Sequence, residues 1–296
     1  MSDSTVTIIG LGAVGNTLAE ACLQNSVSLK SVVTTNKKKA AYFSERNISV
    51  FNTIKELPID TDSIIFIAVP DDSIKGVVTK IAEYTKDISF PDRVIFTHCS
   101  GAITSDVLKP LASTGASVAA FHPLQTFSLT TGGDRFQDIF ISIEGEEEAT
   151  QVLKKFAELL GARPVFLSRE QKRSLHTAAV FASNYLVAVM HAAENIALNA
   201  GIDEPMLKLR PLIEQTMQNI FTGGPMNALS GPVRRGDLIT VKDHLNLLVP
   251  EKNVKELYTS AGLYLTSMLE NEKDIDSERN ESLKNLFRNE QRQKEK

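Results

Sequence analysis

Two histidine-containing stretches carry residue types that can perform acid–base chemistry. HCSG occupies residues 98–101, and FHPLQTF occupies residues 121–127. Each places a histidine at the end of an apolar, strand-like run, beside small or turn-forming residues. An imidazole ordinarily titrates near neutral pH, so a histidine at such a position can accept or donate a proton. A single histidine there can equally be a hydrogen-bonded strand-end residue. The arrangement of the surrounding elements distinguishes a catalytic histidine from a structural one.

Alternating strands and helices predict a parallel sheet that gathers both stretches at one rim. Apolar, β-branched runs predict strands at 6–10, 29–35, 62–70, 92–100, 117–123 and 138–145, with an edge strand at 164–167. Helices are predicted at 13–25, 37–47, 71–85 and 147–161. Strands this apolar indicate a sheet covered on both faces. Ligands bind beyond the carboxyl ends of such strands, so His98, Ser100 and His122 are the catalytic candidates, while strand alternation directs Cys99 into the sheet.

The stretch VTIIGLGAVGNTLAEA places Gly10, Gly12 and Gly15 as G-x-G-x-x-G between the first strand and the first helix. In that context glycines permit a tight turn, close approach to a pyrophosphate and close packing of helix on strand. The amides at the helix start favour the anion. A glycine turn without a ligand is the alternative. The predicted cofactor site also includes the apolar turn at the end of the 62–70 strand, giving Gly10, Leu11, Gly12, Ala13, Val14, Gly15, Ala68, Val69 and Pro70.

The end of the second strand predicts which dinucleotide binds. NAD sites usually carry an acidic residue there, but this chain reads VVTTNKKKA. Thr35 and Asn36 can hydrogen-bond a 2′-phosphate, and Lys37, with Lys38 and Lys39, can neutralise it. NADP is therefore favoured, with NAD as the second choice. The alternative is that the lysines simply form the solvated start of a helix.

The second half of the chain is predicted to be helical. Ser168 and Gln171 form a capping box that opens a helix running to Gly201, and further helices are expected at 203–221, 237–248 and 251–271. The helix between Ser168 and Gly201 is alanine-rich and apolar on most faces, so it should be buried as the spine of this half or as a dimer seam. The charged stretch that follows the 251–271 helix is expected to be a solvated helix or a frayed tail.

Three residues of this half are predicted to bind substrate. His176 and Asn184 lie on the long helix, where polar side chains either line a cleft or bond to the backbone. Arg235 stands in the loop GPVRRGD. A guanidinium suits a carboxylate or phosphate, which suggests an anionic substrate. The alternative is helix capping by Asp237, with exposed arginines.

Bulk properties exclude several classes of protein. The chain has 296 residues, 42% hydrophobic and 23% charged, with a formal net charge of -4. This balance gives no reason to expect nucleic acid or a membrane surface as a partner, and the sequence lacks a membrane-length apolar run and a signal-peptide pattern. Two cysteines provide neither a disulfide framework nor metal-ligand spacing. We expect a cytoplasmic protein without a metal, divided into domains at 1–167 and 168–272 and a tail at 273–296.

Several of these stretches together resemble a known group of enzymes. They are IIGLGAVGNTLAEA, AVPDDSI, THCSGAITSDVLKPLASTGASVAAFHPLQTF, HTAAVFASNYLVAV and SGPVRRGD. The chain is similar to the superfamily of prephenate dehydrogenases, pyrroline-5-carboxylate reductases, ketopantoate reductases and β-hydroxyacid dehydrogenases. It resembles most the branch of Rossmann-like NADP oxidoreductases with a helical C-terminal domain of unknown function.

The resemblance implies a Rossmann domain and an all-α C-terminal domain of the 6-phosphogluconate dehydrogenase type, which binds substrate and forms a homodimer. It implies that His122-Pro123 matches the histidine–proline pair of prephenate dehydrogenases and that Ser100 matches their substrate-binding serine. The Lys-x-x-x-Asn motif of β-hydroxyacid dehydrogenases is not kept, because Val180 stands four residues before Asn184.

The sequence therefore predicts an α/β protein with a doubly wound, mostly parallel sheet, acting as an NADP-dependent oxidoreductase. It would transfer a hydride between nicotinamide and a small, anionic carbonyl, hydroxyl or imine compound, with His122 as the acid–base or hydroxyl-orienting group. Two alternatives remain: a dinucleotide-binding sensor or scaffold without turnover, and a reductase that uses a deazaflavin.

Overall fold

The computed structural model describes residues 5–57, 59, 63–87, 90, 93–113, 115–127, 133–270, 272 and 276–292. The chain forms two compact units, Met1–Asn184 and Tyr185–Lys296. We expected the boundary between domains after residue 167. The division between the two compact units falls within the long helix, whose first turns pack on the sheet, and the predicted domain boundary stays a prediction.

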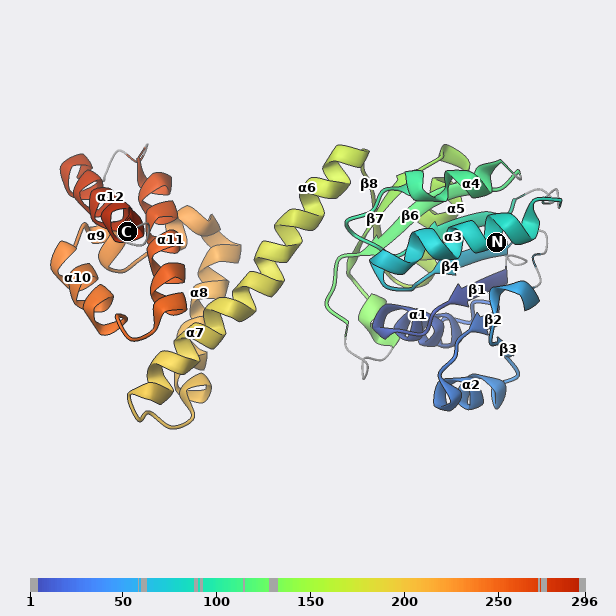
Figure 1. Ribbon diagram of the computed structural model, residues 1–296, viewed down its shortest axis with the longest axis horizontal. Coiled ribbons are helices and arrows are strands. Elements are labelled where there is room, and N and C mark those ends of the chain that lie inside the picture. Colours follow the sequence, from blue (N-terminus) through green and yellow to red (C-terminus); the bar gives the residue numbers. More distant parts are fainter. Residues whose placement is uncertain are drawn as a thin grey trace. The chain divides into compact units, whose positions relative to one another are not determined.

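The first unit is built on a sheet of eight strands within the described residues (Figure 1). The strands are β1 (Thr5–Ile9), β2 (Leu29–Val33), β3 (Ser49–Phe51), β4 (Ser63–Ile67), β5 (Ile95–His98), β6 (Ser117–Pro123), β7 (Phe140–Gly145) and β8 (Arg163–Phe166). They lie in the order β3-β2-β1-β4-β5-β6-β7-β8. Strand β7 is antiparallel to β6, and the other neighbouring pairs are parallel. The predicted doubly wound, mostly parallel sheet is confirmed.

Helices cover both faces of this sheet. One face carries α1 (Ala13–Gln24), α2 (Lys37–Ser44) and α5 (Glu147–Leu159), and the other carries α3 (Asp71–Thr85) and α4 (Lys109–Ala112). Alternation along β1 feeds both cores, since Val6 and Ile8 pack on the first face and Ile9 packs on the second. Short 3₁₀ turns η1 (Ile54–Glu56), η2 (Ser105–Leu108) and η3 (Gly133–Phe136) complete the unit.

The strands are shorter at their carboxyl ends than the sequence predicts. Residues 34–35, 68–70 and 99–100 leave the sheet and form turns at the rim. Strand β3, which pairs with β2, was not predicted, because three residues are too few to show a period of two. The rim thus consists of turns that place backbone and side chains where ligands bind.

The long helix consists of α6 (Arg169–Val180), a π-helical turn η4 (Phe181–Tyr185) and α7 (Leu186–Asn199). The predicted capping box is present: the Ser168 hydroxyl accepts from the Gln171 amide, and the Gln171 side chain accepts from the Ser168 amide. We expected the long helix to be buried on several sides. In the single chain α7 has no buried residue in the described structure, and Val187 and Leu198 are exposed.

The second unit contains α8 (Pro205–Ala228), α9 (Pro232–Arg235), α10 (Leu238–Leu247), α11 (Lys252–Leu269) and α12 (Ser277–Arg292). The expected solvated tail is wrong for α12, which packs on α11. Leu283 and Phe287 are fully buried, and the Asn280 amide donates to the Thr266 carbonyl oxygen at 3.0 Å. Its apolar residues are few, but they recur at helical spacing on one face.

Candidate active site

The glycine loop contains glycines of two kinds. A Cβ on Gly10, whose φ is +94°, would lie 2.8 Å from the Ala68 carbonyl oxygen, and a Cβ on Gly15 would lie 2.0 Å from the Gly10 carbonyl oxygen. The protein's own packing requires glycine at both positions. A Cβ on Gly12 would meet only the Ala68 oxygen, at 4.0 Å. Gly12 caps α1, so its lack of a side chain fits the position where the motif brings the backbone close to a pyrophosphate.

A cavity of about 1050 Å³ lies beside this loop at the ends of β1 and β2. Of the predicted cofactor residues, Gly10, Leu11, Thr35, Asn36 and Val69 line it. The others belong to the adjoining loops and do not line it: Gly12, Ala13, Val14, Gly15, Lys37, Ala68 and Pro70. The sequence missed Asn52, Thr53, Ile54 and Lys55, which follow β3, and Lys80, Glu83 and Tyr84 of α3. Their position depends on β3 lying beside β2, which only the sheet order reveals.

The lysine run is divided between capping and the loop. The Asn36 side-chain oxygen accepts from the amides of Lys38 and Lys39, at 3.1 and 3.2 Å, and so caps α2. Lys39, rather than Lys37, reaches the glycine loop, where its Nζ donates to the Leu11 carbonyl oxygen at 2.5 Å. Lys55 and Lys80 add cations to the cavity lining. The region therefore offers positive charge at the place where a 2′-phosphate is expected, although through different lysines.

His98 ends β5 and is fully buried. Its Nδ1 accepts from the Ser100 amide at 3.2 Å, and its Nε2 lies 3.2 Å from the Thr104 carbonyl oxygen. Both contacts are satisfied by a neutral ring with its proton on Nε2. Burial, followed by the nearby Lys172 ammonium, lowers the pKa of His98 to about 4. Since both ring nitrogens already bond to the backbone, the strand-end interpretation is favoured for His98.

Of the two residues after His98, Ser100 is buried and Cys99 is partly buried. The Ser100 hydroxyl accepts from the Ile103 amide at 3.1 Å and holds the turn after β5. The Cys99 thiol packs against the core, and burial raises its pKa to about 12. The Cys99 side chain therefore points toward the core, as alternation predicts, and substrate contact by Ser100 stays a prediction.

His122 shares a second cavity with the long helix. The cavity, of about 390 Å³, is lined by His122, Pro123, Leu124, Gln125, Thr126, His176, Ala179, Val180, Ala182, Ser183 and Asn184. The structure thus brings together three predicted residues, His122, His176 and Asn184. The rings of His122 and His176 meet edge to face, with centroids 5.6 Å apart. Among the described residues, the lining of this cavity contains imidazoles, amides and hydroxyls but no lysine, arginine or carboxylate. An anionic substrate therefore stays a prediction.

The histidine pair is packed closely against Gly101. A Cβ on Gly101 would lie 2.2 Å from His176 Nδ1 and 2.7 Å from His122 Nε2. His176 Nδ1 is buried and has no hydrogen-bond partner among the described residues. Asn184 lies in the π-helical turn, a conformation frequent at functional sites and one that the sequence did not predict.

The electrostatics of His122 differ from the expectation. Burial, followed by the Lys172 ammonium and then by His176 and His98, lowers the pKa of His122 to about 3. The expected titration near neutral pH is therefore wrong. At neutral pH the ring is uncharged and can accept and donate hydrogen bonds, but it holds no extra proton to transfer.

Lys172 is a further residue near the site that the sequence did not indicate. It lies in the first turns of α6 among charged residues that are typical of a solvated helix start, yet only 1% of it is exposed. Its Nζ donates to the carbonyl oxygens of Ser100, at 2.5 Å, and Gly101, at 3.1 Å. No sequence signal separates it from its neighbours, because its burial comes from the docking of α6 on the rim.

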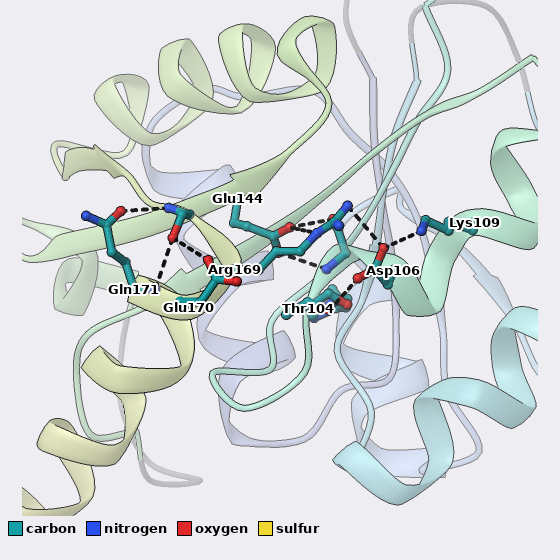
Figure 2. A network of polar contacts seen from close by, with 10 residues as sticks. Thr104, Asp106, Lys109, Glu144, Arg169, Glu170 and Gln171 are labelled. Carbon is teal, nitrogen blue, oxygen red and sulfur yellow. Dashed lines mark hydrogen bonds and ion pairs between the residues drawn. The ribbon is translucent and has the colours of Figure 1, made fainter.

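The helix start is fastened to the sheet by a polar network, which Figure 2 shows. Arg169 reaches Asp106 at 3.1 Å and Glu144 at 3.4 Å. The buried Glu144 carboxylate also accepts from the amide and hydroxyl of Ser105, at 2.8 and 2.7 Å. Lys109 pairs with Asp106 at 2.7 Å. Together these contacts hold the beginning of α6 against the loop that follows β5.

Arg235 lies in the second unit. It borders a separate cavity with Asp237, Asp276 and Arg279, all of that unit. Asp237 caps α10 by accepting from the Thr240 amide at 3.1 Å, as the capping interpretation predicts. Substrate binding by Arg235 stays a prediction.

Comparison with protein families identifies both halves of the chain. Residues 2–123 match the Rossmann-like domain, and residues 139–265 match a domain of unknown function, DUF2520. The chain joins a Rossmann-like domain to a DUF2520 domain. The second match begins just before β7, so the DUF2520 domain includes the last two strands of the sheet as well as most of the helices that follow. No curated protein matches the chain.

Solved structures share the fold. A proposed NADP oxidoreductase from Bacteroides fragilis is 23% identical, with a TM-score of 0.73 over 88% of this chain and 96% of that one. A Thermotoga maritima protein is 25% identical, with a TM-score of 0.68 over 90% and 99%. An imine reductase from Myxococcus stipitatus, in complex with NADP⁺, is 13% identical, with a TM-score of 0.65 over 94% and 99%.

Proposed function

We propose that the chain is an NADP-dependent oxidoreductase that transfers a hydride between nicotinamide and a small carbonyl, hydroxyl or imine compound. The observation that carries this proposal is the order of features along one rim of the sheet. The glycine loop and the larger cavity lie at β1 and β2, Val69-Pro70 follows β4, and the His122 cavity follows β6. Three strand spacings, about 14 Å, separate β1 from β6. A dinucleotide held at the loop would extend toward His122.

The residues present fit such a cofactor. Gly12 leaves the backbone at the start of α1 open to a pyrophosphate. Thr35 lines the cavity and can hydrogen-bond a 2′-phosphate, and Lys39 and Lys55 supply positive charge. When bound, the nicotinamide supplies the hydride donor or acceptor. The NADP oxidoreductase and imine reductase of the same fold support this choice.

The chain's own residues would bind and orient the substrate. The neutral His122 ring can hydrogen-bond the reacting oxygen or nitrogen, and the Asn184 amide in the same cavity can hold a second polar group. His176 Nδ1, which lacks a partner among the described residues, is the third polar atom available there. A sensor without turnover would need the larger cavity alone.

The test combines cofactor binding with one substitution. Titration with NADPH and NADH, followed by nicotinamide fluorescence, should show saturable binding that favours NADPH. With a substrate found among small carbonyl and imine compounds, His122→Asn should lower turnover by about a hundredfold or more, because it removes the ring nitrogen that hydrogen-bonds the reacting atom, and leave NADPH binding unchanged. His191→Asn, at an exposed histidine, is the matched control. Full turnover in His122→Asn would remove the proposed role, and NADPH binding without any turnover would favour the sensor.

We also propose that the chain forms a homodimer through α7 and α8. Both helices expose large apolar side chains, among them Val187, Leu207, Leu212 and Phe221. Such residues concentrated on two helices are typical of an interface rather than of a solvated surface. A second copy of the same face would cover them.

A further inference from the structure

A buried lysine, Lys172, contacts the backbone of the turn beside the candidate site. Among the described lysines and arginines, Lys172 is the one that is buried, and no described carboxylate lies within 4.0 Å of its ammonium. Burial lowers its pKa to about 8, while Glu144, Asp71 and Cys99 act in the opposite direction. Removing an ammonium from water is costly unless it is paired. A fold needs only an apolar residue to fasten a helix, so the retained charge calls for another explanation.

The ammonium acts on the peptide that separates it from the histidines. Ser100 and Gly101 offer their carbonyl oxygens to Lys172, and the Ser100 amide donates to His98 Nδ1. On the other side, Gly101 lies so close to His122 and His176 that a single methyl group would collide with both rings. The Ser100–Gly101 peptide is therefore held between Lys172 and the histidine pair.

We propose that Lys172 is a positioning residue of the candidate site: its ammonium holds the Ser100–Gly101 segment against the His122–His176 pair and places a positive charge close to these rings. This inference rests on the proposed function, since it assigns Lys172 a part in the same site. Lys172 does not line the His122 cavity and acts through other residues.

The electrostatic part follows from the groups that face these rings. A positive charge close to an imidazole disfavours the imidazolium. The Lys172 ammonium lowers the pKa of both His98 and His122, after the larger effect of burial. The titratable groups packed around the rings come from five elements and the turn after β5: Asp71 of α3, His98 of β5, Cys99 after it, His122 of β6, Glu144 of β7, and Lys172 and His176 of α6. Lys172 is the cation among them.

The experiment is an NMR titration of the histidine rings in the full-length protein. Five histidines are present, and single His→Gln variants assign their signals. In the wild type, the His98 and His122 rings should stay neutral down to about pH 5. Lys172→Gln keeps hydrogen-bond donors for the two carbonyl oxygens but removes the charge. It should raise the titration midpoints of His98 and His122 by about one pH unit or more, whereas a merely structural anchor would leave them in place.

Controls separate the possible results. Arg173→Gln removes an exposed charge from the next position of α6 and should leave both midpoints unchanged. If Lys172→Gln fails to fold, the titration of the wild type tests the inference. The chemical shifts of His98 and His122 should then show an inflection near pH 8, where Lys172 loses its proton. Unchanged midpoints in a folded Lys172→Gln, or no inflection in the wild type, would overturn the inference. These readouts need no turnover, so a failure of the proposed function is detected separately, by the NADPH titration.

Discussion

Gly12 and Gly15 belong to one motif, but they are required for different reasons. Gly15 is required by the contact between α1 and the Gly10 backbone, whereas nothing in the protein crowds Gly12. Because no contact within the protein requires glycine at position 12, we attribute this glycine to the close approach of a ligand. The same distinction applies to the histidines: His98 has both nitrogens bonded to the backbone, and His176 has a buried nitrogen without a partner in the described structure.

Gly12→Ala and Gly15→Ala should therefore behave differently. A methyl group on Gly12 meets no protein atom closer than 4.0 Å, so Gly12→Ala should keep the thermal stability and weaken NADPH binding by about tenfold or more. Gly15→Ala should lower the stability, because its Cβ would lie 2.0 Å from a carbonyl oxygen. Thermal unfolding with and without NADPH measures both effects. Equal affinity in Gly12→Ala and the wild type would contradict the assignment.

The buried histidines predict a loss of stability in acid. The pKa of His98 is about 4 in the folded chain and about 6.5 when exposed, so the unfolded chain binds a proton more readily between these values. The stability is fully present above pH 6.5 and falls as the pH drops toward 4. His98 alone should account for a loss of about 2 kcal/mol between pH 7 and pH 5. Urea unfolding at both pH values checks this, and a His98→Gln variant that loses as much stability in acid would speak against it.

At the scale of elements, the turn after β5 and the start of α6 form one structural group. The network in Figure 2 joins Arg169 to Glu144 and Asp106, and Lys172 completes it one turn further along. The π-helical turn follows on the same helix and carries Asn184. One helix therefore fastens the loop beside the histidines and also supplies polar groups of the cavity.

Helix α12 is also part of its unit rather than an appendage. Phe287 is fully buried, and Gly262 of α11 lies so close that a Cβ there would be 2.3 Å from the ring. Phe287→Ala should lower the free energy of unfolding of the second unit by about 3–5 kcal/mol, because it leaves a cavity in this small core. Urea denaturation followed by circular dichroism measures the change. Asn289→Ala, exposed on the same helix, should stay within about 0.5 kcal/mol of the wild type, and an equally small effect at Phe287 would refute the packing.

At the scale of the whole molecule, the apolar faces of α7 and α8 predict the oligomeric state. Leu212 and Phe221 are 64% and 77% exposed, so placing glutamates there costs the single chain little and would disrupt a dimer. Light scattering coupled to gel filtration should show a dimer for the wild type and a monomer for Leu212→Glu/Phe221→Glu. Tyr264→Glu, on α11 and 70% exposed, should remain dimeric. A monomeric wild type would exclude the proposed interface. None of the described helices combines the length and apolar character needed to cross a membrane.

Local patterns in the sequence determined the Rossmann-like sheet, the glycine loop, the capping box at Ser168 and the candidates His122, His176 and Asn184. Those features depend on neighbouring residues: periodicity, glycine spacing and strand ends are readable one segment at a time. The tertiary structure alone decided the rest. It separated His98 from His122, placed Lys39 rather than Lys37 at the glycine loop, and buried Lys172 and Phe287. Burial and the pKa of a side chain depend on which distant segments pack around it, and no local pattern carries that information.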